Sequence, residues 1–462
     1  IDNASPQHHL LYQLPTGGGK TVIFSEIVRR YIQKHDKKVV VLTHRIELCK
    51  QTSKMLKGFG VKNKIINSNV KELPDQNDYS CFVAMVIIDE AHYNSFRKLL
   101  SSFKKAFILG VTATPLSSNI KLPMHQNYDE LIVGDTIQSL INKGFLAKAI
   151  TYSYDVGLTS LKVGINGDYT VKSSDDLYTN IKKKKKLLHA YTEKSLGKKT
   201  LIFNNGINTS LYVYETFREA GYDVRHLDNT SSTEERKDIL HWFKHTPNAI
   251  LTSVGILTTG FDEPTVETII LNRATKSLTL YFQMIGRGSR KLDNKDEFTV
   301  IDLGNNAARF GLWSDPVNWQ HIFKSPEYYL ENLRDDAEIE QYFKYEMPPE
   351  LRTKFSKTKV VTFDVDEEHK QVIRQNLRSK VVLEKSLEQH AAMCVDNTED
   401  LQAAKNLARE LEEDIECRVK RFSKCLSQCS KNYREWLVED YKMKLTVLIG
   451  KKYREKIMNE AD

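Results

Sequence analysis

The stretch PTGGGKT, residues 15–21, decides the fold class of this chain. It follows a short apolar run and precedes a helical pattern over Val22–Gln33, which is the context that a phosphate-binding loop requires. Closely spaced glycines let backbone N–H groups point into a concave loop, and the helix N-terminus adds positive potential. The residues expected to hold a nucleotide are therefore Gly17, Gly18, Gly19, Lys20 and Thr21, with Lys20 at the β- and γ-phosphates and Thr21 on Mg²⁺.

One feature of this loop keeps an ordinary glycine-rich turn open as the alternative. The general phosphate-binding pattern has a glycine five residues before Gly19, and this chain has Leu14 there. A short motif on its own carries a false-positive risk, so the rest of the chain has to decide.

Short apolar runs alternate with amphipathic stretches on both sides of a central connector. The runs at 39–42, 86–88 and 107–109 predict buried parallel strands, and so do those at 200–203, 249–251, 268–271 and 298–301. Strand–helix alternation predicts an α/β fold with a doubly wound parallel sheet in each half. We expect one domain at 1–149, a connector at 150–180 and a second domain at 181–310.

The last part of the chain has a different composition. After Pro349 it contains no further proline, and Gly450 is its only glycine, which favours long helices. Leu407, Leu411 and Ile415 fall on one face of such a helix. We expect a transition segment at 311–369 and an all-α region at 370–462.

An acidic pair follows one of the predicted strands. Asp89 and Glu90 come directly after Val86–Ile88, at the end of the strand where ligands bind in α/β proteins. Asp89 is expected to hold Mg²⁺, and Glu90 to orient and deprotonate the attacking water. The alternative is a solvated helix start, at which acidic residues favour the helix dipole.

Two further motifs follow strands or strand–helix boundaries. GVTATP, residues 110–115, fits an ordinary strand end with helix-capping hydroxyls when taken alone. In QMIGRGSR, residues 283–290, Arg287 and Arg290 are three positions apart and would share a face of a helix. Such a pair can hold a γ-phosphate, and an arginine finger contributes about 10³–10⁵ in rate. The alternative is a pair of surface arginines.

The order of the motifs resembles that of superfamily 2 helicases of the DEAH-box type. The resemblance is carried by PTGGGKT, THRIEL (43–48), DEAH (89–92), TATP (112–115), LIFNNG (201–206), TTGFDEP (258–264) and QMIGRGSR. It covers residues 11–305 and is greatest to the branch that holds XPB-like helicases and restriction-enzyme motors.

The resemblance implies two RecA-like domains, ATP and Mg²⁺ as cofactors, and nucleic acid as the partner, with DNA favoured over RNA. It assigns catalysis to Glu90, Lys20, Arg287, Arg290 and Gln283. It implies coupling between the domains by His92, Thr112 and Thr114, with Gln283 opposite His92. It places Gly260 and Asp262 between ATP and the nucleic-acid track, and it assigns nucleic-acid contacts to Thr43, His44, Thr258 and Thr259.

The chain departs from the family pattern in two places. Members of this family often have an adenine-reading Gln upstream of motif I. It lies further from motif I than the 19 residues that precede Lys20 in this chain. In addition, Thr43 and Asp89 are 46 positions apart, which is short for motifs Ia and II. An unbroken apolar run at 81–88 suggests that two strands are fused and that residues are absent at Met85–Val86, together with motif Ib.

Charge and composition favour a polyanionic partner and a cytoplasmic location. Residues 366–462 hold equal numbers of basic and acidic side chains, so the net charge of +8 lies on residues 1–365, which contain the motifs. Six cysteines form no disulfide framework, no leader pattern opens the chain, and no apolar run is long enough for a membrane helix.

Three functions remain open from the sequence: a strand-separating helicase, a duplex translocase of a restriction or antiviral system, and an ATP-gated nucleic-acid sensor. The third would signal through a protein partner bound at the C-terminal helices.

Overall fold

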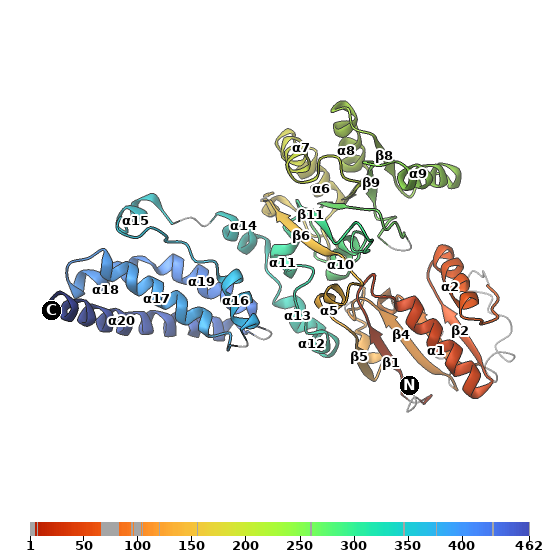
Figure 1. The fold of residues 1–462 in the computed structure, drawn as a ribbon, viewed down its shortest axis with the longest axis horizontal. Coiled ribbons are helices and arrows are strands. Elements are labelled where there is room, and N and C mark those ends of the chain that lie inside the picture. Colours follow the sequence, from red (N-terminus) through yellow and green to blue (C-terminus); the bar gives the residue numbers. More distant parts are fainter. Residues whose placement is uncertain are drawn as a thin grey trace. The chain divides into compact units, whose positions relative to one another are not determined.

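The computed structural model describes most of the chain and forms two units, residues 1–340 and 341–462 (Figure 1). The described residues are 5–6, 8–65, 83–93, 96, 103, 105–119, 121–154, 156–258, 261–344, 347–375, 377–426 and 429–461. The first unit contains two parallel sheets, and the second is made of helices.

The first sheet has five parallel strands in the order β2-β3-β4-β1-β5. Its strands are β1 (Leu10–Gln13), β2 (Lys38–Leu42), β3 (Val83–Asp89), β4 (Phe107–Thr112) and β5 (Glu130–Val133). The helical segments of this part are α1 (Lys20–His35), α2 (Ile46–Gly58), η1 (Ala91–Tyr93), η2 (Met124–Gln126) and α5 (Ile137–Asn142). Because β1 lies between β4 and β5, the loop that follows it opens at the carboxyl edge of the sheet, one strand in from the end.

Strand β3 is one unbroken strand through Met85 and Val86. Met85 pairs with Phe107 of β4, and Val86 pairs with Val40 of β2 and Ile108 of β4. An inner strand of a parallel sheet is covered on both faces by the crossover helices, and β3 is buried at every residue but Ala84, so a continuous apolar run is what its position requires. The hypothesis that two strands are fused at Met85–Val86 is therefore wrong. The segment 66–82, which precedes β3, lies outside the described residues.

The second sheet has six parallel strands in the order β6-β11-β10-β7-β9-β8. Its strands are β6 (Lys148–Ser153), β7 (Thr200–Asn204), β8 (Val224–Leu227), β9 (Ile250–Val254), β10 (Thr268–Asn272) and β11 (Glu297–Asp302). Its helices are η3 (Leu158–Ser160), α6 (Val171–Tyr178), α7 (Ile181–Ser195), α8 (Ile207–Glu219), α9 (Thr233–His245), α10 (Leu278–Ile285), α11 (Asn306–Phe310), α12 (Trp319–Lys324), α13 (Pro326–Glu331) and the start of α14 (Asp336–Lys344).

The structure shifts the expected boundaries on both sides of the second domain. β6 begins the expected connector, yet it pairs with β11 along its whole length and is the edge strand of the second sheet. The passage between the sheets therefore lies around α5. At the other end, Ile322 and Phe323 of the expected transition segment are buried in the core of the first unit.

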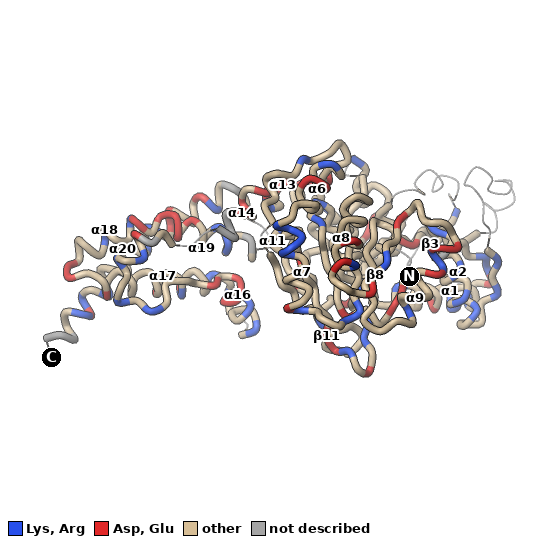
Figure 2. The backbone as a smooth tube through the Cα atoms, turned by 90° about the horizontal axis from the view of Figure 1, so that it is seen from above, with Lys and Arg blue, Asp and Glu red and all other residues tan. Residues whose placement is uncertain are grey.

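The second unit is helical, as the sequence predicts, and begins earlier than residue 370. Its helices are the end of α14, α15 (Pro349–Thr353), α16 (Val365–Arg374), α17 (Val381–Asp396), α18 (Leu401–Glu410), α19 (Glu412–Cys425) and α20 (Lys431–Ala461). Phe355 and Val365 are completely buried in its core, which is why the unit extends upstream. Leu411 separates α18 from α19, so the apolar face expected for one helix is shared by two. Basic and acidic residues are interspersed along these helices (Figure 2). None of the described helices is long and apolar enough to span a membrane.

Candidate active site

The PTGGGKT loop joins β1 to α1, as its sequence context predicts. Gly17 and Gly19 have φ values of +86° and +87°, a conformation that side chains disfavour. Helix α1 begins at Lys20, has no side-chain cap and carries no acidic residue in its first turn. Its first N–H groups and its positive end are thus arranged as an anion-binding loop requires. Lys20 Nζ donates a 3.3 Å hydrogen bond to the Leu14 carbonyl.

The acidic pair lies at the end of β3, close to Lys20. Asp89 is buried, and Glu90 has a left-handed φ of +52° that turns the chain out of the strand. Burial and the Glu90 carboxylate raise the pKa of Asp89 to about 7. Burial acts to raise the pKa of Glu90 too, but Lys20 and His92 outweigh it and the pKa of Glu90 is lowered. Glu90 is therefore the ionised member of the pair.

A magnesium nucleotide fits this set of residues. Burial lowers the pKa of Lys20, while Glu90 and Asp89 oppose the shift, so the ammonium lies near both carboxylates. The Glu90 Oε2 atom is buried and makes no hydrogen bond within the described part of the chain. Asp89 and the hydroxyl of Thr21 supply hard oxygen atoms of the kind that Mg²⁺ prefers.

A chain of hydrogen bonds runs from this site into the second domain. The Thr112 hydroxyl donates to the Thr114 carbonyl at 3.0 Å and therefore accepts from His92 Nδ1, also at 3.0 Å. His92 Nε2 is then left to accept from the Gln283 amide at 3.4 Å. The Thr114 hydroxyl donates to the hydroxyl of Thr279 on α10 at 2.8 Å. Burial lowers the pKa of His92 to about 4, which agrees with this neutral ring.

The arginines of QMIGRGSR come from the second domain and do not share a helical face. Helix α10 ends at Ile285, because the chain turns at Gly286, so Arg287 and Arg290 lie in the loop beyond it. Arg287 donates to the carbonyls of Phe261 and Thr258, the latter at 2.6 Å. Arg290 Nε donates to Asp262 at 2.7 Å.

Motif VI packs directly on the PTGGGKT loop. A Cβ atom at Gly17 would lie 2.8 Å from Arg290 Nη1 and 2.9 Å from Ser289 Oγ. A Cβ atom at Gly286 would lie 2.6 Å from Thr16 Cγ2. The two glycines therefore allow a close approach between the domains, which brings Arg290 to the phosphate-binding loop.

The residues predicted to touch nucleic acid are engaged within the protein. The Thr43 hydroxyl donates to the Arg45 carbonyl at 3.3 Å and lies 2.9 Å from Cys49 Sγ. The His44 ring stacks on Phe96 with centroids 4.7 Å apart. The Thr258 hydroxyl donates to Gly255 at 2.6 Å. Thr259 and Gly260 lie outside the described residues.

Two contacts between the domains escaped the sequence reasoning. Arg45 Nη1 donates to the Ile256 carbonyl at 3.2 Å, and Thr279 receives the hydrogen bond from Thr114. Arg45 lies inside the THRIEL motif, so its position in the motif could have indicated a functional contact. Nothing in the sequence indicates the contact of Thr279, because its partner Thr114 is 165 positions away.

Comparisons with known proteins agree with this arrangement. The family "Helicase conserved C-terminal domain" matches residues 182–291. The family "Type III restriction enzyme, res subunit" matches residues 2–84 and 62–117, two pieces that overlap over residues 62–84, between motifs Ia and II.

Individual relatives point the same way. A 51.5 kDa protein of Lactococcus phage (isolate 7-9) is 28% identical over 324 residues, which are 68% of this chain and 70% of that protein. A Saccharomyces cerevisiae protein named as the ATP-dependent helicase IRC3 is 30% identical over 349 residues, 66% of this chain and 49% of that protein. The chain thus spans about half the length of the yeast relative.

A solved structure has the same fold. The fragment structure of an HsdR subunit of a type I restriction enzyme from Vibrio vulnificus YJ016 superposes with a TM-score of 0.52 at 22% identity. The matched parts are 67% of this chain and 62% of that chain. One family model matches the first sheet domain and the other the second, so both sheet domains are similar to those of ATP-dependent helicases.

Proposed function

We propose that this chain hydrolyses ATP with Mg²⁺ between its two sheet domains and uses the reaction to separate the strands of DNA. The observation that carries the proposal is the meeting of the two domains at the PTGGGKT loop. Gly17 and Lys20 of the first domain and Arg290 of the second lie at one place, next to the carboxylates of β3. Phosphoryl transfer needs positioning and positive charge on both sides of the γ-phosphate, which this arrangement supplies.

Each residue has a distinct part in the proposed reaction. Lys20 and the N–H groups at the start of α1 hold the β- and γ-phosphates. Asp89 and Thr21 hold Mg²⁺, which neutralises charge on the phosphates when it is bound. Glu90, kept ionised by Lys20, orients the attacking water and accepts its proton. Arg290 stabilises the charge that develops on the transferred phosphoryl group.

The proposal of a nucleic-acid track rests on charge, and the choice of DNA rests on the XPB-like resemblance. The net charge of +8 lies on residues 1–365, the part that carries the helicase motifs. Contacts of Lys and Arg with phosphates give affinity with little sequence preference. Repeated closing and opening of the two domains would then move the protein along a strand.

The deciding experiment measures ATP hydrolysis with single-stranded DNA, duplex DNA and RNA side by side. We expect DNA to stimulate turnover and Lys20→Ala to abolish it. Lys54→Ala is the matched control, because Lys54 is an exposed lysine of α2. Equal turnover by wild type and Lys20→Ala would refute the site, and stimulation by RNA alone would refute the choice of DNA.

A duplex translocase is the second candidate. It is favoured by the match to the type III restriction enzyme res subunit and by the fold likeness to an HsdR subunit. A translocase would displace a triplex-forming strand from duplex DNA without separating the duplex, whereas a helicase would separate a forked duplex. The two assays, run on one preparation, distinguish the candidates.

A further inference from the structure

A tight turn in the second domain presents an isoleucine that the fold does not use. Gly164–Gly167 form the turn, with Gly167 N–H donating to the Gly164 carbonyl at 3.0 Å and Gly164 N–H to Asp168 at 2.8 Å. Ile165 at its tip is fully exposed, with a relative exposure of 110%. Turn tips favour Gly, Asn and Asp, and a β-branched residue adds nothing to turn stability. Ile165 is the most exposed of the large apolar side chains in the described part of the chain.

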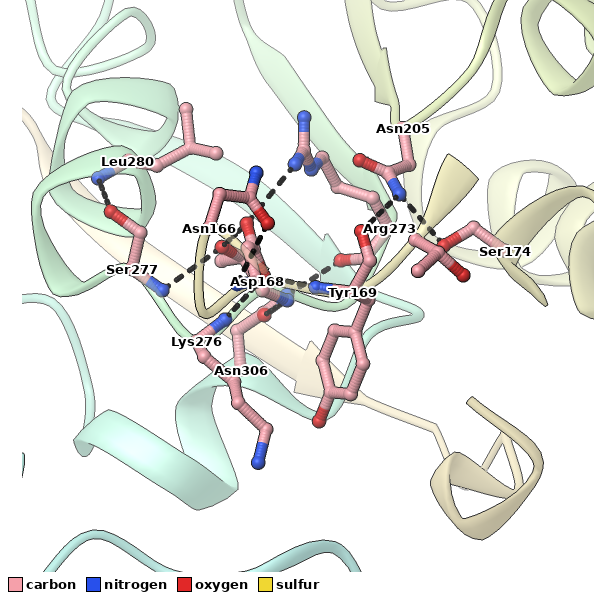
Figure 3. A network of polar contacts seen from close by, with 12 residues as sticks. Asn166, Asp168, Tyr169, Ser174, Asn205, Arg273, Lys276, Ser277, Leu280 and Asn306 are labelled. Carbon is pink, nitrogen blue, oxygen red and sulfur yellow. Dashed lines mark hydrogen bonds and ion pairs between the residues drawn. The ribbon is translucent and has the colours of Figure 1, made fainter. Parts of the chain in front are cut away.

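The turn is held rigidly by Asp168, which stands at its base (Figure 3). One carboxylate oxygen accepts from the Lys276 N–H at 2.8 Å and the Tyr169 N–H at 2.9 Å. The other accepts from the Thr275 hydroxyl at 2.7 Å and lies 3.6 Å from Arg273 Nη2. A rigid support matters because a side chain that is already positioned loses little entropy on binding.

A second set of contacts fixes the other side of the turn. The Tyr169 ring is buried, and its hydroxyl accepts from Arg309 at 2.6 Å. The Tyr169 carbonyl accepts from Asn205 Nδ2 at 3.3 Å, and the same nitrogen donates to Ser174 at 2.7 Å (Figure 3). The turn is thus anchored to both β7 and β10 through the residues that follow them.

These anchors place Ile165 at the carboxyl edge of the second sheet. Asn205 follows β7, within the LIFNNG motif, and Arg273–Lys276 follow β10 and lead into α10. Ligands of parallel α/β sheets bind at this edge. Because α10 also carries Gln283 and leads to Arg290, the turn is joined to the helix that contacts the ATP site.

The tip lies between two exposed lysines. Lys162 and Lys172 on either side of the turn are exposed, as are the apolar side chains of Val163 and Val171. Asp168 is the only acidic residue between Lys162 and Lys172, and its oxygens are occupied by the contacts above. An apolar tip between lysines combines a surface for a base with charges for phosphates.

We propose that Ile165 is a wedge that packs against the last base pair at a duplex–single-strand junction and unstacks it. This inference rests on the proposed motor function and adds to it the element that would separate strands. Proteins that insert isoleucine or leucine between base steps unstack them in the same way. Lys162 and Lys172 would hold the flanking phosphates.

The test uses a forked DNA duplex that carries 2-aminopurine at the junction, whose fluorescence rises when the base unstacks. The variants are Ile165→Ser, Ile165→Leu and Leu196→Ser. Leu196 is an exposed leucine between α7 and the start of β7, at the opposite edge of the same sheet, and is the matched control. DNA-stimulated ATP hydrolysis, fluorescence on binding with a non-hydrolysable ATP analogue, and strand displacement are measured for each variant.

We expect Ile165→Ser to keep DNA-stimulated hydrolysis within about twofold and to lose about tenfold in strand displacement, together with the fluorescence rise. Ile165→Leu and Leu196→Ser should behave like the wild type. Wild-type fluorescence and displacement in Ile165→Ser would overturn the wedge, and would direct the exposed tip to a protein partner. A wild type that hydrolyses ATP on DNA without a fluorescence rise would also overturn the wedge while leaving the motor intact. Absence of DNA-stimulated hydrolysis in the wild type would instead refute the proposed function.

Discussion

Arg287 and Arg290 are three positions apart in sequence and have different surroundings. Arg287 donates to two backbone carbonyls of motif V, and burial lowers its pKa to about 10. Arg290 is partly exposed, has one ion pair with Asp262, and borders Gly17. Arg287 thus supports the loop that carries Asp262, while Arg290 is the arginine that can turn to a bound phosphate.

Arg290→Ala should lower the turnover number by about 10³ and change nucleotide affinity only a few-fold, because an arginine finger acts mainly in the transition state. Steady-state hydrolysis and a fluorescent nucleotide titration measure the two quantities. Arg287→Ala, the comparison variant, should also lower the melting temperature, since it removes the hydrogen bonds to Thr258 and Phe261. Normal turnover at saturation with weakened nucleotide binding in Arg290→Ala would contradict the assignment.

At the scale of elements, most strands that the sequence predicts are buried on both faces, and the exception is the edge strand β2, which its apolar run predicted although it is only partly buried. β7 and β10 are completely buried, and each appears in the sequence as an uninterrupted apolar run. β6 is also partly exposed at the edge of its sheet, but its sequence carries no such run, and it was assigned to a connector. For β3 the prediction failed in a different way, because it divided one long apolar run into two strands, whereas the structure has a single strand there.

The candidate site was predictable where chemistry is confined to a motif, as in Lys20, Asp89 and Glu90. It was not predictable where contacts link distant elements. The hydrogen bond of Asp168 with Thr275 joins residues 107 positions apart, and neither belongs to a motif used in the prediction. The helical face assumed for Arg287 failed because the chain leaves α10 at Gly286.

The junction of α10 with the PTGGGKT loop can be tested through Gly286. This residue has a right-handed helical conformation, so alanine adds no backbone strain there, but its Cβ would lie 2.6 Å from Thr16 Cγ2 and 2.7 Å from Thr16 Cβ. Gly286→Ala should therefore push motif VI away from the loop and lower turnover at least about tenfold, with a smaller effect on nucleotide binding.

Thr16→Gly removes the atoms that would clash, so it should restore part of the turnover when it is combined with Gly286→Ala. Steady-state hydrolysis by the two single variants and the double variant measures this non-additivity. Losses that simply add would mean that Gly286 acts through something other than its contact with Thr16.

At the scale of the whole molecule, the chain has two units with separate apolar cores. The core that contains Phe203, Ile269 and Tyr281 belongs to the first unit, and the one that contains Val382, Leu411 and Ile449 belongs to the second. Ligands that bind only the folded form stabilise the unit that binds them. Magnesium with a non-hydrolysable ATP analogue should therefore raise the unfolding temperature of the first unit and leave that of the helical unit unchanged in a calorimetric scan. Equal shifts of both transitions would contradict separate cores.

The helical unit should have its own dependence on pH, which originates at His390. This side chain is completely buried, with Nε2 2.7 Å from Asp414 Oδ2 and Nδ1 2.9 Å from the Tyr441 hydroxyl. Arg418 lies 2.8 Å from the same Asp414 oxygen. In the neutral ring Nε2–H donates to Asp414 and Nδ1 accepts from Tyr441, so both nitrogens are satisfied. Burial lowers the pKa of His390 to about 4 from its ordinary value of 6.5.

The sign of the effect follows from where the proton binds. Between pH 6.5 and about 4 the unfolded chain binds a proton at His390 that the folded unit does not. The stability that the neutral His390 gives to the helical unit is therefore complete above pH 6.5. It falls as the pH is lowered, by up to about 1.4 kcal/mol per pH unit. In His390→Gln this slope should be absent, although the broken hydrogen-bond network makes the unit less stable at pH 7.

Urea unfolding of the full chain at pH 7.0, 6.0 and 5.0, followed through the helical transition, tests the assignment. His241→Gln changes an exposed histidine of the first unit and should leave the helical transition as it is in the wild type. A His390→Gln variant whose helical unit loses stability with falling pH as steeply as the wild type would assign the dependence to another group.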